Sequence, residues 1–270
     1  MLFLPRILLQ ASMNSNVIIL LLFFTINSFS LSSQDAYDIN WNKEWKYIGT
    51  GVGTGLLGLY LLNQASPISR EEYLSLDPSQ INRFDRIAVS LESGISAKLS
   101  DYFANGSAVL PLLVYSTKFR DKEWIESAIM YADVVMINAG LVTISKYAIG
   151  RHRPYLYDSG KKRTSFGVSD SAAFYSGHTS FASSNSFFAA AIFQRAYPNS
   201  PAIPYVYGVA ASVPLVTGYL RVRSGVHFPS DVIVGYAAGA AVAFAVIQVH
   251  KKDDIELTAG SNGIGLTWTF

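Results

Sequence analysis

The sequence predicts an all-α protein, a compact helical bundle that carries a small β-hairpin at its C-terminus. Several nearly uncharged runs in the 270-residue chain are too long for strands, and they are rich in Ala, Gly and Ser. That composition is typical of helices that pack closely against one another. After residue 254 the apolar residues change to strict alternation, which is the period of a strand. The two patterns together predict this fold class.

The first 34 residues predict an export signal. Arg6 is their only charged residue, residues 17–24 are all apolar, and residues 28–30 include small side chains at a position suited to cleavage. We expect a signal peptide over residues 1–30, with an uncleaved anchor helix as the alternative. Either form exports the segment that follows it. We therefore expect a membrane-associated protein on the periplasmic side of a bacterial envelope.

Residues 35–250 are expected to form one helical domain. Its four glycines between residues 51 and 58 are interpreted as packing positions, because no Lys-Ser or Lys-Thr pair follows them as in a phosphate-binding loop. Gly235 and Gly239 have the spacing of helix contacts in membranes, which a crowded soluble bundle also uses. The expected helices lie over residues 103–117, 132–145, 180–194, 204–220 and 232–249.

Residues 255–270 are expected to form the hairpin. Apolar residues alternate on both sides of Asn262-Gly263, a pair that favours a tight hairpin turn. An alternating segment that ends in a C-terminal Phe is also typical of the last strand of an outer-membrane barrel. One hairpin cannot close a barrel, which needs roughly eight strands or more, so we expect it to dock on the helical domain.

The composition excludes several classes of function. Only 15% of the residues are charged, compared with about a quarter in soluble proteins, and the formal net charge is +2. The longest basic run is residues 161–163, so DNA and RNA are not expected partners. The chain has no cysteine, which excludes disulfides, thiolate metal sites and cysteine nucleophiles.

Three polar clusters stand at the ends of the expected helices. The first contains Lys146, Arg151, His152 and Arg153, and Pro154 is expected to end the preceding helix there. These cations can clamp an anion, although cations also occur at helix C-termini simply because they complement the helix dipole.

The second cluster, Tyr175-Ser176-Gly177-His178-Thr179, opens the next helix. Ser is a favoured N-cap, Gly permits close approach of a ligand, and the free N–H groups of a helix N-terminus bind phosphate. A histidine in a first turn is otherwise a surface or capping residue.

The third cluster contains Arg221, His227 and Asp231, with Pro229 in the first turn of the last helix. We expect His227 at a solvent-facing helix start, with Asp231 accepting one imidazole N–H so that the other nitrogen is free to attack. The alternative is a helix-start hydrogen bond without a chemical role.

The order and spacing of these clusters resemble the three-part signature shared by type 2 phosphatidic acid phosphatases (PAP2), bacterial acid phosphatases and vanadium haloperoxidases. Six residues separate Lys146 from Arg153, and five separate Arg221 from His227. The resemblance covers about residues 132–249 and implies a PAP2-type helical fold.

The resemblance also implies the roles of the site residues. His227 is the nucleophile, Asp231 holds it, and His178 is the acid and base. Phosphate is bound by a set of five residues: Lys146, Arg153, Ser176, Gly177 and Arg221. No metal and no cofactor is implied, because the cations replace them.

Two positions depart from the common signature, since Tyr175 stands where Pro is usual and Leu220 where Ser is usual. The loss of a hydroxyl at Leu220 affects rate or substrate preference, but every chemical group is present. We therefore expect hydrolysis of a phosphate monoester or pyrophosphate through a phosphohistidine, with a phosphorylated lipid at a membrane as the preferred substrate and a small phosphate as the other. A vanadate-dependent haloperoxidase and a non-catalytic envelope protein are the alternatives.

Overall fold

The computed structural model describes residues 39, 41–118, 122–158, 160, 163–251, 255–260 and 263–268. The predicted signal peptide over residues 1–30 lies outside this described part.

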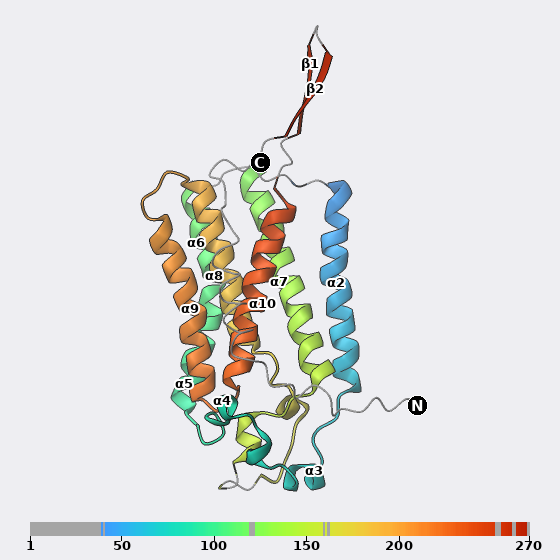
Figure 1. The fold of residues 1–270 in the computed structure, drawn as a ribbon, viewed down its shortest axis with the longest axis vertical. Helices are drawn as coiled ribbons and strands as arrows, with labels where there is room; N and C mark the ends of the chain where they lie inside the picture. The colour runs from blue at the N-terminus through green and yellow to red at the C-terminus, as the bar shows by residue number, and fades with distance from the viewer. Residues whose placement is uncertain are drawn as a thin grey trace.

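In the part of the chain that the structure describes, seven longer helices stand side by side and form an elongated body (Figure 1). They are α2 Trp41–Gln64, α5 Gly94–Ser107, α6 Val109–Lys118, α7 Lys122–Ile149, α8 Gly177–Ala196, α9 Ile203–Arg223 and α10 Pro229–Val249. Short helices fill the connections at the lower end of the body: α3 Arg70–Leu74, η1 Pro78–Gln80, α4 Arg83–Arg86, η2 Pro154–Tyr157 and η3 Val168–Ser171. The predicted helical class is confirmed.

The run over residues 103–117 was expected to form one helix, and this prediction is wrong. It is divided between α5 and α6, and Ala108 caps the first of them. Pro111 explains the break, because proline has no N–H to bond to the carbonyl of Ser107 and its ring crowds that carbonyl.

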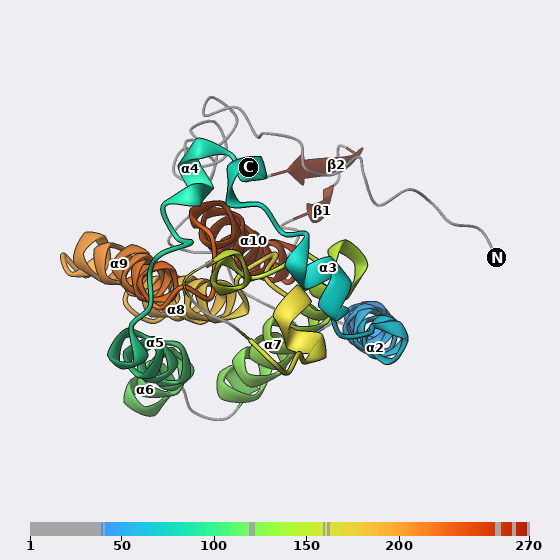
Figure 2. The same ribbon diagram turned by 90° about the horizontal axis from the view of Figure 1, so that it is seen from below.

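Helix α8 lies at the centre and packs against α5, α6, α7, α9 and α10 (Figure 2). Most of its residues are small and buried, which lets the neighbouring helices approach closely. At Gly239 of α10, an added Cβ would lie only 2.1 Å from the carbonyl oxygen of Ser180 in α8. The spacing of Gly235 and Gly239 therefore serves the contact between these two helices.

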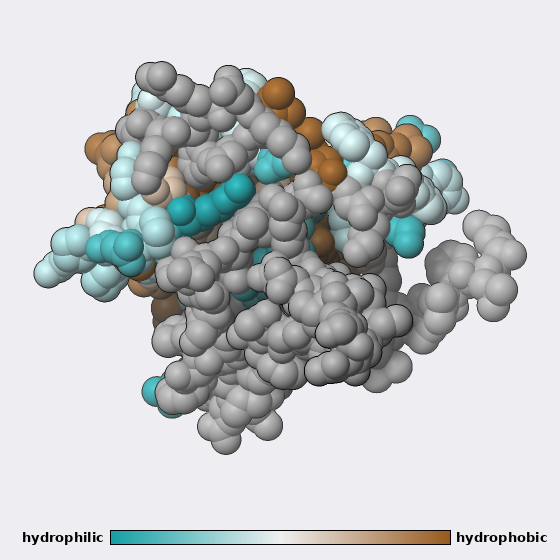
Figure 3. All heavy atoms as spheres, turned by 90° about the horizontal axis from the view of Figure 1, so that it is seen from above, coloured by the Kyte–Doolittle hydropathy of each residue, from teal (hydrophilic) through white to brown (hydrophobic). Residues whose placement is uncertain are grey.

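Among the described residues, three helices are long and apolar enough to cross a membrane, within Trp124–Tyr157, Ile203–Arg223 and Pro229–Val249. Large apolar side chains are exposed along the body, for example Leu56 in α2 and Leu215 in α9. Figure 3 looks onto the upper end, where patches of hydrophobic residues and hydrophilic residues both reach the edge of the body. Because soluble monomers rarely expose such contiguous surfaces, the described part is membrane-associated.

The strands β1 Ile255–Gly260 and β2 Gly263–Trp268 pair antiparallel, with Ile255 opposite Trp268 and Gly260 opposite Gly263. In Figure 1 they project beyond the upper end of the body. Among the described residues, neither strand makes an extensive contact with a helix.

Candidate active site

The three polar clusters meet at the lower end of the helical body. The C-termini of α7 and α9 and the N-termini of α8 and α10 all lie at this end (Figure 1). Residues more than 80 positions apart in the sequence, such as Lys146 and Asp231, are therefore brought into one region.

Lys146 lies in the last turn of α7, and its amine reaches the start of α8. Its Nζ lies 3.8 Å from the position that a Cβ would take at Gly177. The helix ends at Ile149 because Gly150 adopts the left-handed conformation, with φ of 63°. Pro154 was expected to end this helix, but it opens η2 instead.

Arg153 lies in the loop that follows α7, not on the helix end. Its backbone N–H donates to the carbonyl of Asp170 at 2.9 Å, and its side-chain Nε donates to the carbonyl of Ser169 at 2.8 Å. A second guanidinium nitrogen lies 3.5 Å from the carbonyl oxygen of Val226, the residue before His227. The loop thus holds this cation beside the third cluster.

Helix α8 begins with Ser176 as its N-cap, but the Ser176 side chain does not cap the helix. Its Oγ instead pairs with Oγ1 of Thr179 at 2.9 Å, and its N–H donates to the carbonyl of Asp231 at 3.0 Å. No described side chain caps this terminus, so the N–H groups of Gly177, His178 and Thr179 are available to an anion, whereas that of Ser180 donates to the carbonyl of Ser176 at 3.0 Å.

His178, in the first turn of α8, is bonded to a residue that the sequence did not point to. Its Nε2 lies 2.9 Å from Oδ1 of Asp101 in α5. Burial, together with the charges of Arg221 and Lys146, lowers the pKa of His178 to about 4, against the opposing effect of Asp101. The imidazole is therefore neutral at pH 7 in the absence of an anion.

Arg221 projects from the last turn of α9 and is buried. One guanidinium nitrogen donates to Oγ of Ser100 at 3.2 Å and to Oδ1 of Asp101 at 3.4 Å. Its Nε has no hydrogen-bond partner within the described part of the chain. Asp101, whose side chain is half exposed, thus bridges Arg221 and His178 from the solvent side.

His227 is buried, with 1% of its surface exposed, so the expected solvent-facing position is wrong. Neither ring nitrogen has a hydrogen-bond partner among the described residues. Burial holds the pKa of His227 well below its usual value, and the nearby charges of Arg153 and Arg221 lower it further. A neutral imidazole with a free lone pair, surrounded by cations, is suited to attack an electrophilic phosphorus atom.

Asp231 occupies the first turn of α10, which begins at Pro229 as predicted. Its Oδ2 accepts the backbone N–H of Phe228 at 2.8 Å and lies 3.5 Å from Nδ1 of His227. The latter distance is longer than a hydrogen bond, so the expected bond between this pair is not formed in the structure. The contact nevertheless leaves Nε2 as the nitrogen farther from the carboxylate.

A second ion-pair network supports Asp231 from behind. Arg151 bonds to Oδ1 of Asp231 and donates to Oδ2 of Asp85 at 2.8 Å, and its guanidinium lies over the Phe228 ring at 4.2 Å. Ser230 donates to Asp85 through its N–H at 2.9 Å and its hydroxyl at 2.7 Å. Burial opposes ionisation of Asp85, but the Arg151 charge and these bonds outweigh it and lower the pKa of this carboxyl.

No sequence pattern points to Asp85 or Asp101 as site residues. Asp85 lies 66 residues from Arg151, and Asp101 lies 120 residues from Arg221. Both carboxylates come from the segment before the three clusters, where no motif marks them. A local pattern cannot reveal such contacts, because they depend on how α4 and α5 pack onto the later helices.

Comparison with known proteins agrees with the signature. The family model described as "PAP2 superfamily" matches residues 128–255, which include all three clusters. One similar solved structure is the "first transmembrane PAP2 type phosphatidylglycerolphosphate phosphatase from Bacillus subtilis". It is 20% identical, with a TM-score of 0.45, and the match covers 74% of this chain and 95% of that chain. None of the curated proteins matches. Residues 128–255 of the chain belong to the PAP2 superfamily.

Proposed function

We propose that the protein is a phosphatase that hydrolyses a phosphate monoester or pyrophosphate through a phosphohistidine at His227. The observation that carries this proposal is the neutral, buried His227 imidazole, whose nitrogens have no hydrogen-bond partner among the described residues and which is surrounded by cations. Lys146, Arg153, Arg221 and the N-terminus of α8 would bind the phosphoryl oxygens, on which negative charge is spread during transfer.

In the first step, Nε2 of His227 attacks phosphorus, and the bond from phosphorus to the leaving oxygen breaks. His178 donates its proton to that oxygen, so the leaving group departs as an alcohol or as a protonated phosphate. In the second step, His178 takes a proton from water, the water oxygen attacks phosphorus, and the bond to His227 breaks. Inorganic phosphate is released and both imidazoles return to their starting state.

His178 must be protonated to act as the acid, although its pKa is about 4 in the ligand-free protein. A bound phosphate dianion adds negative charge beside the imidazole, which favours the protonated form and raises this pKa. His178 is therefore protonated, and able to act as the acid, only when substrate is bound.

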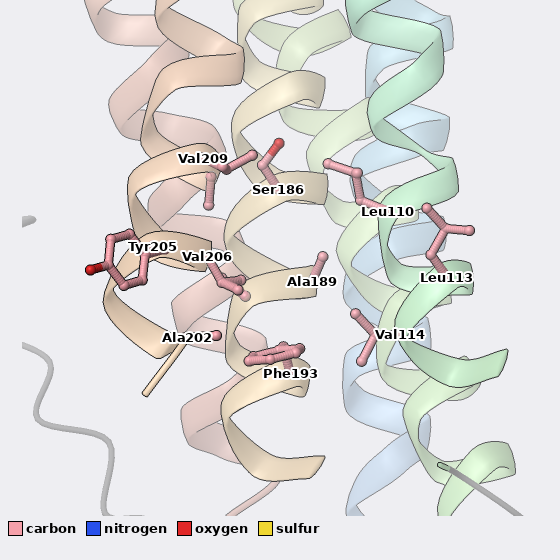
Figure 4. A pocket seen from close by; sticks show the side chains of 12 residues that line it. Leu110, Leu113, Val114, Ser186, Ala189, Phe193, Ala202, Tyr205, Val206 and Val209 are labelled. Atoms are coloured by element: carbon pink, nitrogen blue, oxygen red, sulfur yellow. The ribbon is translucent and has the colours of Figure 1, made fainter. Parts of the chain in front are cut away.

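A lipid substrate is supported by two apolar pockets between the helices. The larger, of about 320 Å³, is lined by α6, α8 and α9, with Leu110, Phe193 and Val209 among its side chains (Figure 4). The smaller, of about 280 Å³, lies between α5 and α9 and shares Leu110 with the larger. Tyr102, which follows Asp101 in α5, lines the smaller pocket, and this favours an acyl chain that extends from the phosphate site into it.

Phosphate release from lipid and soluble phosphates, measured with purified wild-type and His227→Ala protein, tests the proposal. We expect wild-type turnover that increases with acyl chain length, survives EDTA and is inhibited competitively by vanadate. Restoration by a divalent metal of turnover lost from a chelated enzyme that is still folded would contradict the proposed mechanism. Bromide oxidation supported by vanadate, without phosphate release, would favour the haloperoxidase alternative.

We propose that the site faces away from the cytoplasm, in agreement with the export signal predicted over residues 1–30. The signal exports the segment that follows it, so this location requires that α2, which connects the upper end of the body to the site end (Figure 1), does not cross the membrane. Helix α2 is not among the described helices that are long and apolar enough to cross one. Alkaline phosphatase, which is active only outside the cytoplasm, can be fused after Ser66 at the site end or after His250 at the upper end. An active fusion after Ser66 is expected, and an inactive one overturns the proposed location.

A further inference from the structure

A second buried histidine lies at the upper end of the body, far from the candidate active site. His250 directly follows α10, and it meets Glu44 from the first turn of α2 and Asp133 from α7. The exposed fractions of these three residues are 3%, 1% and 1%. The start of α2 and the end of α10 lie at the end opposite the site in Figure 1.

The hydrogen bonds fix which nitrogen of His250 carries a proton. Its Nδ1 lies 2.7 Å from the carbonyl oxygen of Val246, and a carbonyl only accepts, so Nδ1 is the donor. Nε2 faces Oε2 of Glu44 at 3.1 Å and Oδ2 of Asp133 at 3.8 Å. In a neutral imidazole of this tautomer, Nε2 carries a lone pair directed at two carboxylates.

The carboxylates of Glu44 and Asp133 lie beside each other, and His250 is the one described donor group that reaches them. Oε1 of Glu44 and both oxygens of Asp133 are buried without a hydrogen-bond partner, and no described lysine or arginine forms an ion pair with either residue. Burial of unpaired carboxylates is costly unless a positive charge or a proton compensates them. Three unpaired oxygens and one imidazole nitrogen thus point to a missing positive ligand.

We propose that Glu44, Asp133 and His250 bind a divalent transition metal, with Zn²⁺ as the best fit. One ligand atom from each residue can be chosen so that all three lie within 4.8 Å of one another. Ligands bound at about 2.1 Å in tetrahedral geometry lie about 3.4 Å apart, so small side-chain movements suffice. Two carboxylates and a neutral imidazole balance the charge of the ion.

The hydrogen bond from Nδ1 to a backbone carbonyl matches this role. Metal-bound histidines usually donate their second N–H to a carbonyl or carboxylate, which fixes the ring and its tautomer. Such a metal would join α2, α7 and α10 at the point where the chain leaves the helical body. Its role is structural, because the phosphatase groups lie at the other end.

Metal binding to the full-length protein in detergent tests the proposal, with any affinity tag removed and bound metal stripped by chelation. Titration with Zn²⁺ should give one ion per chain by calorimetry and elemental analysis, together with a rise in the melting temperature. Glu44→Gln and Asp133→Asn should each weaken binding by roughly 100-fold or more. The matched control is Glu126→Gln, which alters another buried carboxylate of α7, one that lies 4.0 Å from Arg195; its Zn²⁺ affinity should match that of the wild type.

Failure of the wild type to bind Zn²⁺, Mn²⁺ or Co²⁺ stoichiometrically would overturn the proposal. It would show that bound protons neutralise the negative charge of the two carboxylates. Equal affinity in Asp133→Asn and wild type would overturn it as well. If the variants fail to fold, the visible spectrum of Co²⁺ bound to wild-type protein reports nitrogen and oxygen ligation directly. The His227→Ala protein should bind Zn²⁺ normally, so the result does not depend on the phosphatase.

Discussion

His227 and His250 are both buried at ends of the same helical body, but they face opposite charges. His227 lies among Lys146, Arg153 and Arg221, whereas His250 lies between Glu44 and Asp133. Because cations disfavour an imidazolium, the first histidine, the proposed nucleophile, is kept neutral. Carboxylates favour a positive partner, so the second histidine suits a cation. Burial alone therefore does not define the role of a histidine; the surrounding charges do.

The largest effect expected at the cationic end is that of His227→Ala. Removal of the proposed nucleophile should reduce kcat by at least about 10⁴-fold. Because His227 is buried, the variant should also unfold at a lower temperature, so turnover is measured well below that temperature. His152→Ala, in the loop of the first cluster, is the matched control and should retain activity. Turnover near the wild-type rate in His227→Ala would rule out the proposed mechanism.

Asp231→Asn should reduce kcat less than His227→Ala, by about 10² to 10³-fold. An amide cannot stabilise the positive charge that develops on His227, and it weakens the bond to Arg151. Asp85→Asn separates the two effects, because it weakens the other bond of Arg151 without facing His227. Equal losses of turnover in the two variants would show that Asp231 acts only through Arg151.

Asp101→Asn should tighten inhibition by inorganic phosphate about fivefold. The Asp101 carboxylate contacts both His178 and Arg221, the groups proposed to meet the phosphoryl oxygens, and an exposed ion pair contributes about 1 kcal/mol. Glu71→Gln removes an exposed charge at the same end without this contact and should leave the inhibition constant unchanged. Weaker inhibition by phosphate in Asp101→Asn would instead indicate that the Asp101 carboxylate positions His178.

The smallest effect concerns stability against pH. The pKa values of His178 and His227 are lower in the folded protein than the usual value near 6.5, so the unfolded chain binds more protons below that pH. The contribution of these histidines to the free energy of unfolding is therefore present above pH 6.5 and is lost as the pH falls toward 4. Melting temperatures between pH 7.5 and 4.5 should decline less steeply in His227→Gln than in wild type. Equal slopes would show that His227 is not kept neutral by its surroundings.

Much of the site could be predicted because its parts are local. Each cluster combines a helix end with polar residues at fixed spacing, and Pro229 and Gly177 mark two of those ends. The burial of His227 could not be predicted in this way. The residues that cover it come from four helix ends and a loop, and the sequence near His227 resembles an ordinary exposed helix start.

The sequence by itself determined the helical class, the PAP2 signature and the identity of the groups proposed to act on phosphate. The tertiary structure decided which groups meet: Asp101 with His178, Arg151 with Asp85 and Asp231, and Glu44 with Asp133 and His250. Local rules fix where helices start and end, since capping and proline geometry act within one turn. Contacts between residues as far apart as Glu44 and His250 exist only after the helices pack, and their packing depends on the whole chain.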